Sequence, residues 1–360
     1  MQRFLKSFSL ILILGLISAV SVCASDMPGG EAQHEESPRL AILAGKPYRP
    51  AWAPIPVLRD KSAWAPTLHR LLKSPDSVTR ARSAFLLGQI GSRTSIKPLA
   101  DKLNDPSPAV RTQVGIALAC IGDTRGLKAC ANALETHASW IRYYAAYGLW
   151  NINTSQAKEV LKTHANGQDA LTMQAIEGAL NTPYIAPPAP DPIREKNAKA
   201  FSANGIWAEA AVMLAGESDW WWHKGDYDQA IRCHEAGLLM DPHNVEGYSL
   251  IAWLQWSLGR GPVAVRTLKR CVAANPSDPN AYYELGNHYF ITKKYALAEE
   301  PLRKSVSLGG DNLARRSYAH CLEKLGKLDE ALAQWAAIVK ANPKDGAARV
   351  NLNRVRKLID

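Results

Sequence analysis

Nine histidines are the residues of this 360-residue chain that could hold a metal ion or carry a proton near neutral pH. A metalloprotease helix presents the segment His-Glu-x-x-His, whose four-residue spacing places both rings on one helix face. No such segment occurs here, and no Gly-x-Ser-x-Gly turn presents a nucleophilic serine. A phosphate-binding glycine loop follows a strand, and we predict no strands. The sequence therefore predicts no catalytic residue, no metal and no cofactor.

The cysteines form no metal site either. Beyond the first 24 residues they are Cys120, Cys130, Cys233, Cys271 and Cys321. Their spacing matches neither a Cys-x-x-Cys pair nor a dense disulfide framework. Cys120 and Cys130 flank a predicted helix turn, and an oxidising compartment would permit a disulfide between them. Cys130 shares its sequence column with Leu99 and Leu161, which favours the interpretation as a small core residue.

The clearest regularity is a column of alanines in the C-terminal half. Its members are 34, 34 and 33 residues apart: Ala230, Ala264, Ala298 and Ala331. Five residues before each alanine stands a turn residue, in order Gly225, Gly259, Lys293 and Gly326. Twelve residues after each, the unit closes with Pro242, Pro276, Gly310 and Pro343. A small alanine lets two helices approach closely, glycine turns the chain and proline ends a helix, so the pattern predicts repeated helical hairpins.

This frame resembles the tetratricopeptide repeat (TPR) family, with units at about 211–244, 245–278, 279–311 and 312–345. The resemblance implies that the first helix of each hairpin lines a concave groove that binds other molecules. Residues in the columns that face this groove are Asp219, Trp222, Trp253, Trp256, Tyr283, Asn287, Phe290, Arg316 and His320. Trp222 and Trp256 are one repeat apart, so we expect their rings to lie side by side. Trp335 belongs to a packing column instead.

A second period, of 31 residues, governs the N-terminal half. It aligns Arg80, Arg111 and Arg142, and also Leu87, Leu118, Leu149 and Leu180. The segments ARSAFLLGQIG and NDPSPAVRTQVGIALACIGD resemble short HEAT repeats of the type shared with phycobilisome-lyase proteins. The resemblance implies a helical solenoid over 63–181, in which such arginines bond acidic groups or backbone in neighbouring turns.

A stripe on the second helices of this solenoid provides a second candidate contact face. It includes Arg82, and it carries Tyr144 and Tyr147, which we expect to be exposed. An exposed aromatic stripe can mark a contact surface. The alternative is that the two tyrosines cover the end of the array.

The chain opens with a segment typical of a secretory signal peptide. Arg3 and Lys6 precede an apolar run that is too short to span a membrane. We predict cleavage after Ala24, which removes residues 1–24 and leaves a mature chain without a transmembrane helix. The alternative is a lipoprotein signal in which Cys23 carries the lipid. Either interpretation places the mature protein outside the cytoplasm, in the periplasm or secreted, or anchored to a membrane through Cys23.

Two proline-rich segments divide the rest of the chain. Residues 25–62 are predicted to be a flexible leader. Residues 182–193 are predicted to be a semi-stiff polyproline linker that keeps two folding units apart. The predicted fold is therefore all-α, with two α-solenoids: a HEAT-like array over 63–181, then a TPR array with a capping helix over 194–360.

Charge narrows the range of partners. The formal net charge is +10 at pH 7, but basic and acidic residues are interspersed along the chain. Nucleic-acid binding concentrates Lys and Arg on one face, so we predict no nucleic-acid partner. The sequence predicts an exported, non-catalytic scaffold or adaptor that binds a protein or extended peptide through the TPR groove and the HEAT face. The alternatives are an envelope-polysaccharide-binding module and a bilin-lyase-like enzyme, against which the predicted export argues.

Overall fold

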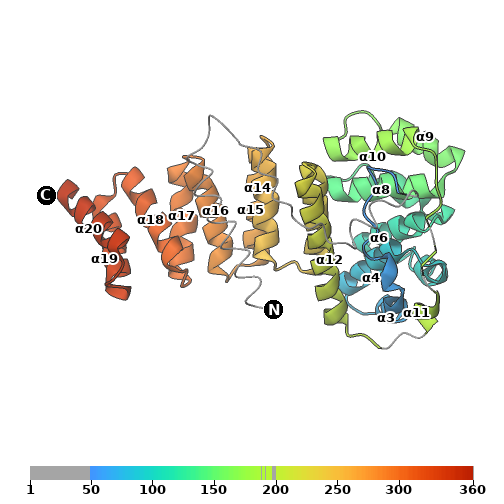
Figure 1. The fold of residues 1–360 in the computed structure, drawn as a ribbon, viewed down its shortest axis with the longest axis horizontal. Helices are drawn as coiled ribbons and strands as arrows, with labels where there is room; N and C mark the ends of the chain where they lie inside the picture. Colours follow the sequence, from blue (N-terminus) through green and yellow to red (C-terminus); the bar gives the residue numbers. More distant parts are fainter. Residues whose placement is uncertain (1–48, 188, 191, 197–199, 360) are drawn as a thin grey trace. The chain divides into compact units, whose positions relative to one another are not determined.

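The computed structural model describes residues 49–187, 189–190, 192–196 and 200–359. The predicted signal peptide, the alternative lipid site at Cys23 and the leader up to residue 48 lie outside the described residues. Every regular element in the described ranges is a helix, and none of them is a strand (Figure 1). The prediction of an all-α fold built from two solenoids is confirmed.

The N-terminal array consists of short first helices and longer second helices. Its elements are η1 (Arg59–Trp64), α3 (Ala65–Leu71), α4 (Ser77–Ile90), η2 (Arg93–Ser95), α5 (Ile96–Ala100), α6 (Pro108–Cys120), η3 (Thr124–Gly126), α7 (Leu127–Ala133), α8 (Ser139–Ile152), α9 (Ser155–Thr163) and α10 (Ala170–Asn181). Small residues let the second helices approach one another. A Cβ atom added at Gly88 of α4 would lie 2.7 Å from the Cα of Ala117 on α6. The glycine is therefore required where these two helices meet.

The arginine column of this array is structural, as predicted. Arg80 donates two hydrogen bonds of 2.8 Å to the buried carboxylate of Asp105 in the next repeat. Arg142 also pairs with a carboxylate of the next repeat, donating from two nitrogens to the Oδ2 atom of the half-buried Asp169. Arg111 bonds only the backbone carbonyls of Asp105 and Pro106. Arg80 and Arg142 thus link their repeats to the next one through a carboxylate, whereas Arg111 fixes the turn that precedes its own helix.

The C-terminal array consists of paired helices of similar length. Its elements are α11 (Pro192–Lys196), α12 (Ala203–His223), α13 (Tyr227–Met240), α14 (Val245–Ser257), α15 (Gly261–Ala274), α16 (Pro279–Ile291), α17 (Tyr295–Ser307), α18 (Asn312–Lys324), α19 (Leu328–Ala341) and α20 (Gly346–Ile359). The four alanines of the predicted column are completely buried. Gly225, Gly259 and Gly326 turn the chain with φ near +75°, and Lys293 takes the equivalent place with φ of +60°. The hairpin pattern read from the sequence is therefore confirmed.

The segment before the first helix is not a flexible leader over its whole predicted length. From residue 49 onward it packs into the core, where Trp52, Ile55 and Leu58 are buried. The Trp52 ring lies directly against Gly178 of α10, where an added Cβ would come within 2.4 Å of the ring. Its indole N–H donates to the Thr182 hydroxyl at 3.2 Å. The prediction of a flexible leader is thus wrong for residues 49–62, because this apolar segment finds a partner surface.

The two arrays are not separate folding units. One cluster of buried apolar side chains runs from Trp52 through the N-terminal array into α12, α13 and α14. A second cluster continues from Ala252 to Val355. Because buried side chains of both arrays share the first cluster, the proline-rich stretch at 182–193 does not isolate them as we predicted. The boundaries at 63–181 and 194–360 remain a division by repeat type.

Candidate functional site

Exposed apolar side chains in the C-terminal array lie mainly on the first helices of the hairpins and on the capping helix α20. Among the described residues from 203 onward, the large ones are Val212 and Trp222 on α12, Trp256 on α14, Ile291 on α16, Leu313 on α18, and Val350, Leu358 and Ile359 on α20; the exception is Leu297 on α17. We call the surface formed by α12, α14, α16, α18 and α20 the first-helix face. Exposed apolar residues that recur on equivalent helices of a repeat array are typical of an interaction surface.

The predicted groove residues all lie on helices of this face. Asp219 and Trp222 are on α12, Trp253 and Trp256 on α14, Tyr283, Asn287 and Phe290 on α16, and Arg316 and His320 on α18. Trp222 is 42% exposed and Trp256 is 39% exposed. Trp253, Tyr283 and Phe290 are half-buried and pack against the cores. The freely accessible aromatic surface is therefore centred on the two tryptophans.

Contrary to our expectation, the rings of Trp222 and Trp256 do not contact each other. Trp222 packs edge-on against His223, with ring centroids 4.8 Å apart. Trp256 packs edge-on against His288 of the next first helix at 6.3 Å. Within the described part of the chain, no ring contact joins Trp222 to Trp256. Each indole instead packs edge-to-face with a histidine ring.

The basic residues of the face are partly committed to other contacts. Arg316 forms an ion pair with Asp345, which also caps α20 by accepting the Ala348 N–H at 3.0 Å. That N–H, together with the Arg316 charge, holds the pKa of Asp345 below its usual value. The His320 ring packs edge-on against Trp335 at 4.9 Å. Partial burial lowers the pKa of His320 and so disfavours the charged form of this ring.

Sequence reasoning missed one polar residue of this face, Glu284. Its carboxylate accepts a hydrogen bond of 2.6 Å from the hydroxyl of Ser249, across the gap from α14 to α16. Burial raises the pKa of Glu284, and the neighbouring charge of Glu246 raises it further. The available signal was that Glu284 is the only carboxylate in the apolar helix α16.

The second candidate face is closed, so the expectation of exposed Tyr144 and Tyr147 is wrong. Tyr144 is only 1% exposed, and its hydroxyl accepts a hydrogen bond of 2.5 Å from Arg232 of α13. Arg82 donates to the backbone carbonyl of Leu239 at 2.7 Å. Tyr147 is half-buried and packs near the Trp52 ring. The physical reason is that α13 and residues 49–58 cover this stripe.

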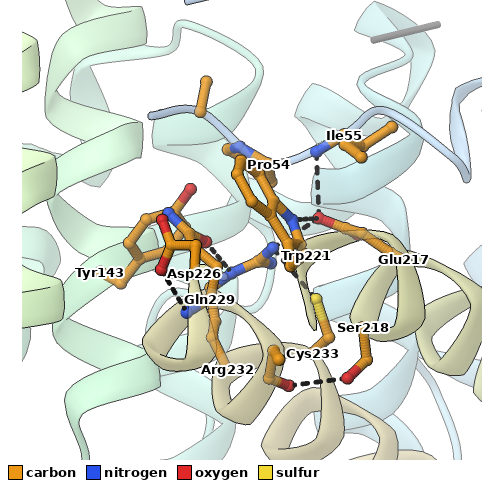
Figure 2. Close-up of polar contacts among 12 residues, drawn as sticks. Pro54, Ile55, Tyr143, Glu217, Ser218, Trp221, Asp226, Gln229, Arg232 and Cys233 are labelled. Carbon is orange, nitrogen blue, oxygen red and sulfur yellow. Dashed lines mark hydrogen bonds and ion pairs between the residues drawn. The ribbon is translucent and has the colours of Figure 1, made fainter. Parts of the chain in front are cut away.

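Polar groups tie these segments together at one place, which we call the junction cluster: Tyr144, Glu217, Gln229 and Arg232. Arg232 is fully buried, donates to Gln229 at 2.7 Å and forms an ion pair with Glu217 (Figure 2). Glu217 also accepts the Ile55 N–H at 3.0 Å (Figure 2). A charge buried in this way persists only when it is paired and hydrogen-bonded. The junction cluster therefore joins the N-terminal segment to both arrays.

The Trp52 carbonyl is a second link at the same place. It accepts hydrogen bonds from the Tyr143 hydroxyl at 2.7 Å and from the Gln229 amide at 3.0 Å. Tyr143 belongs to the N-terminal array and Gln229 to the first TPR hairpin, so one carbonyl bonds both arrays. The chemistry of the junction is structural.

Candidate chemical groups elsewhere give no reactive site in the described residues. No three His, Cys, Asp or Glu side chains there are grouped to hold a metal ion. The five cysteines are free and buried, so Cys120 and Cys130 form no disulfide in this structure. Burial raises the pKa of the Cys120 thiol to about 12. Among the helices that the structure describes, none combines the length and apolar character needed to cross a bilayer.

Comparisons with known proteins divide the chain in the same way. A family model described as HEAT repeats matches residues 65–129 and 96–181. A model described as anaphase-promoting complex, cyclosome, subunit 3 matches residues 262–335. The chain is 27% identical over 141 residues to RNA polymerase II-associated protein 3 from Rattus norvegicus. This alignment covers 39% of this chain and 20% of that protein.

Two further similarities are of the same partial kind. Deoxyhypusine hydroxylase from Cryptococcus neoformans var. neoformans is 26% identical over 117 residues, covering 31% of this chain and 32% of that protein. Among solved structures, YrrB, described as a TPR protein with an unusual peptide-binding site, has 22% identity and a TM-score of 0.34. That match covers 42% of this chain and 78% of the YrrB chain. The chain thus spans a third or less of the length of these two curated relatives.

Proposed function

Because the chain carries HEAT repeats in its N-terminal half and TPR-type repeats in its C-terminal half, we propose that it is a non-catalytic adaptor that binds an extended peptide segment of another protein. The observation that carries the proposal is the run of exposed apolar side chains along the first-helix face. Burying such side chains against a partner removes apolar surface from water, which favours association. Trp222 and Trp256 are the anchors in this proposal, since large aromatic side chains usually dominate interface energies.

A peptide fits this face better than the alternative polysaccharide does. Sugar rings would stack on the faces of Trp222 and Trp256, and this favours a glycan at those two residues. The other large apolar side chains exposed on this face are aliphatic, among them Ile291, Leu313 and Val350. Aliphatic groups suit the side chains of a peptide more than the hydroxyl-rich surface of a sugar. The proposal therefore keeps polysaccharide as the second candidate and includes no bilin-lyase-like reaction.

The HEAT array serves as the base of the adaptor in this proposal. Its second-helix stripe is covered by α13 and residues 49–58, so a partner would meet the first-helix face instead. Rigid attachment to the HEAT array would hold α12, the first helix of that face, in a fixed orientation. The ordered base reduces the conformational entropy that binding would otherwise cost.

Export is the second part of the proposal. The charged start and apolar run of residues 1–24 support cleavage after Ala24, which yields a periplasmic or secreted protein. The alternative product begins at a lipid-modified Cys23. Intact-mass measurement of the protein purified from its native host distinguishes the two. A chain that retains its first residues would contradict both.

Peptide display against purified residues 25–360 tests the binding proposal. The expected result is a set of selected 12-residue peptides whose affinity falls at least thirtyfold in the Trp222→Ala, Trp256→Ala double variant. The matched control is Leu297→Ala, which removes an apolar side chain that is 56% exposed on α17, outside the first-helix face. Equal binding by the wild type and the double variant would contradict the proposed site. Selection of labelled oligosaccharides instead of peptides would favour the second candidate.

A further inference from the structure

The charge on the first-helix face changes sign along the array. Near α14 and α16 the ionisable groups are carboxylates, Glu246 and Glu284. On α18 they are Arg315, Arg316, His320, Glu323 and Lys324, so basic groups outnumber the one carboxylate; Arg316 is paired with Asp345 and Glu323 with Arg354. A ligand that lies along the whole face therefore meets negative charge at one part and positive charge at another.

Glu284 is the most constrained group of the negative part. Its carboxylate reaches across to Ser249 and is held there by the hydroxyl at 2.6 Å. Among the described residues, no lysine, arginine or histidine forms an ion pair with Glu284, whereas Glu235 and Asp228, both on α13, have arginine partners. Glu284 is half-buried, and withdrawing a carboxylate from water without a cation is unfavourable, so a cation supplied by a ligand would relieve that cost.

The surroundings of Glu284 suit a long cationic side chain. Trp253 lies one helical turn after Ser249 on α14, and Asn287 lies three residues after Glu284 on α16. Lysine and arginine carry an apolar stem that packs on aromatic surface while the charged head reaches a polar group. A cation near an indole gains further attraction. Ser249, Trp253, Glu284 and Asn287 thus combine a carboxylate, its positioning hydroxyl, an aromatic wall and an amide.

We propose that these four residues form a subsite for a lysine or arginine side chain of the bound peptide, with Glu284 as its counter-ion. This inference rests on the proposed peptide-binding function of the first-helix face. Because Arg316 is paired with Asp345, Lys324 is the group on α18 that would repel the same side chain, so the subsite fixes which part of the peptide lies over α16. The partner is therefore an extended segment with a cationic residue among apolar ones.

The test uses acetylated and amidated versions of a peptide selected on the wild-type protein. Each position is replaced in turn by lysine, by the neutral isostere norleucine and by glutamate, and affinities are measured by fluorescence anisotropy. We expect one position at which lysine binds about tenfold more tightly than norleucine, as for a charge-assisted hydrogen bond. In Glu284→Gln that preference should disappear, whereas Glu330→Gln, on the exposed surface of α19, should keep it.

The outcomes separate this inference from the proposed function. If the double tryptophan variant loses binding but the wild type shows no lysine preference, the subsite is wrong and the site stands. A lysine preference that survives in folded Glu284→Gln also overturns the subsite. If Glu284→Gln does not fold, the comparison of lysine with norleucine on the wild-type protein tests the subsite, and equal affinities overturn it. A display experiment that yields no peptide overturns the proposed function together with the subsite.

Discussion

Arg232 on the second helix of the first TPR hairpin donates a hydrogen bond of 2.5 Å to the hydroxyl of Tyr144 on the HEAT helix α8. The two residues are 88 positions apart in the chain and both are buried. The same arginine is paired with Glu217. A side chain of the TPR array is therefore part of the core of the HEAT array.

Replacing Arg232 by methionine should destabilise the whole described fold. The change leaves the Glu217 carboxylate buried without its cation, and such a loss typically costs about 3–5 kcal/mol. Urea unfolding followed by circular dichroism measures it. Arg303→Met is the control, because its pair with Glu300 is exposed. A double variant, Arg232→Met with Glu217→Met, should recover part of the loss, and no recovery would contradict the assigned pairing.

Trp52→Ala should lower stability although Trp52 precedes the first helix. The indole fills the space over Gly178 and packs against Trp150, with ring centroids 5.6 Å apart. Truncating a buried tryptophan typically costs about 3–5 kcal/mol. Trp222→Ala should change stability by less than about 0.5 kcal/mol, because that ring is exposed. Equal effects of the two changes would show that residues 49–58 are not part of the core.

The repeat columns made most of the fold predictable, and the junction was the part that could not be predicted. The period of 34 residues indicates the side of its helix on which Ala230 lies. That side is buried because it faces the partner helix of the same hairpin. The same reasoning placed Tyr144 on an outer stripe of its helix. Its burial depends on α13, which belongs to an array with a different period. Trp52 belongs to neither period, so no repeat pattern marked it.

The candidate site was predictable to a similar extent. The periodic columns placed Trp222 and Trp256 on first helices, and both are exposed as an interaction surface requires. The direction of each ring depends on its neighbours, such as His288 beside Trp256, and column spacing does not specify that. Glu284 was missed because its importance comes from contact with Ser249 on another helix.

The buried cysteines should be inert in the folded protein. Burial disfavours the thiolate, raising the pKa of Cys271 to about 12 and that of Cys321 to about 11. The reactive species is the thiolate, so at pH 8 the folded protein should react with Ellman's reagent only as fast as it unfolds. In denaturant the five cysteines beyond residue 24 should react at once. Rapid reaction of any cysteine in the native protein would contradict its burial.

The same pKa shifts predict a loss of stability in alkali. The thiol pKa is higher in the folded chain than in the unfolded chain, so ionisation above about pH 9 favours the unfolded chain. The stabilising contribution is complete below that pH and is lost as the pH rises toward about 12. Unfolding midpoints in urea should therefore fall over this range. Replacing Cys120 by alanine should weaken the pH dependence, and an unchanged slope would contradict the assignment.

The arginine column should show a graded effect. Arg80 is bonded to a buried carboxylate, whereas Arg111 bonds only backbone carbonyls. Arg80→Met leaves Asp105 buried without its partner, so it should lower the melting temperature more than Arg111→Met does. Differential scanning calorimetry gives both values. The opposite order would mean that the carboxylate of Asp105 is satisfied by other groups.

The contact between Ile55 and Glu217 joins positions 162 residues apart, and this separation has a consequence for biosynthesis. A chain that leaves the ribosome or crosses a translocation pore from its N-terminus releases residues 49–58 long before α12 and α13. Tyr144 and Arg82 lack their α13 partners, Arg232 and the Leu239 carbonyl, until the first TPR hairpin has emerged. The HEAT array therefore passes through a stage in which its aromatic surface is exposed, and during that stage the nascent chain is most open to chaperones and to aggregation.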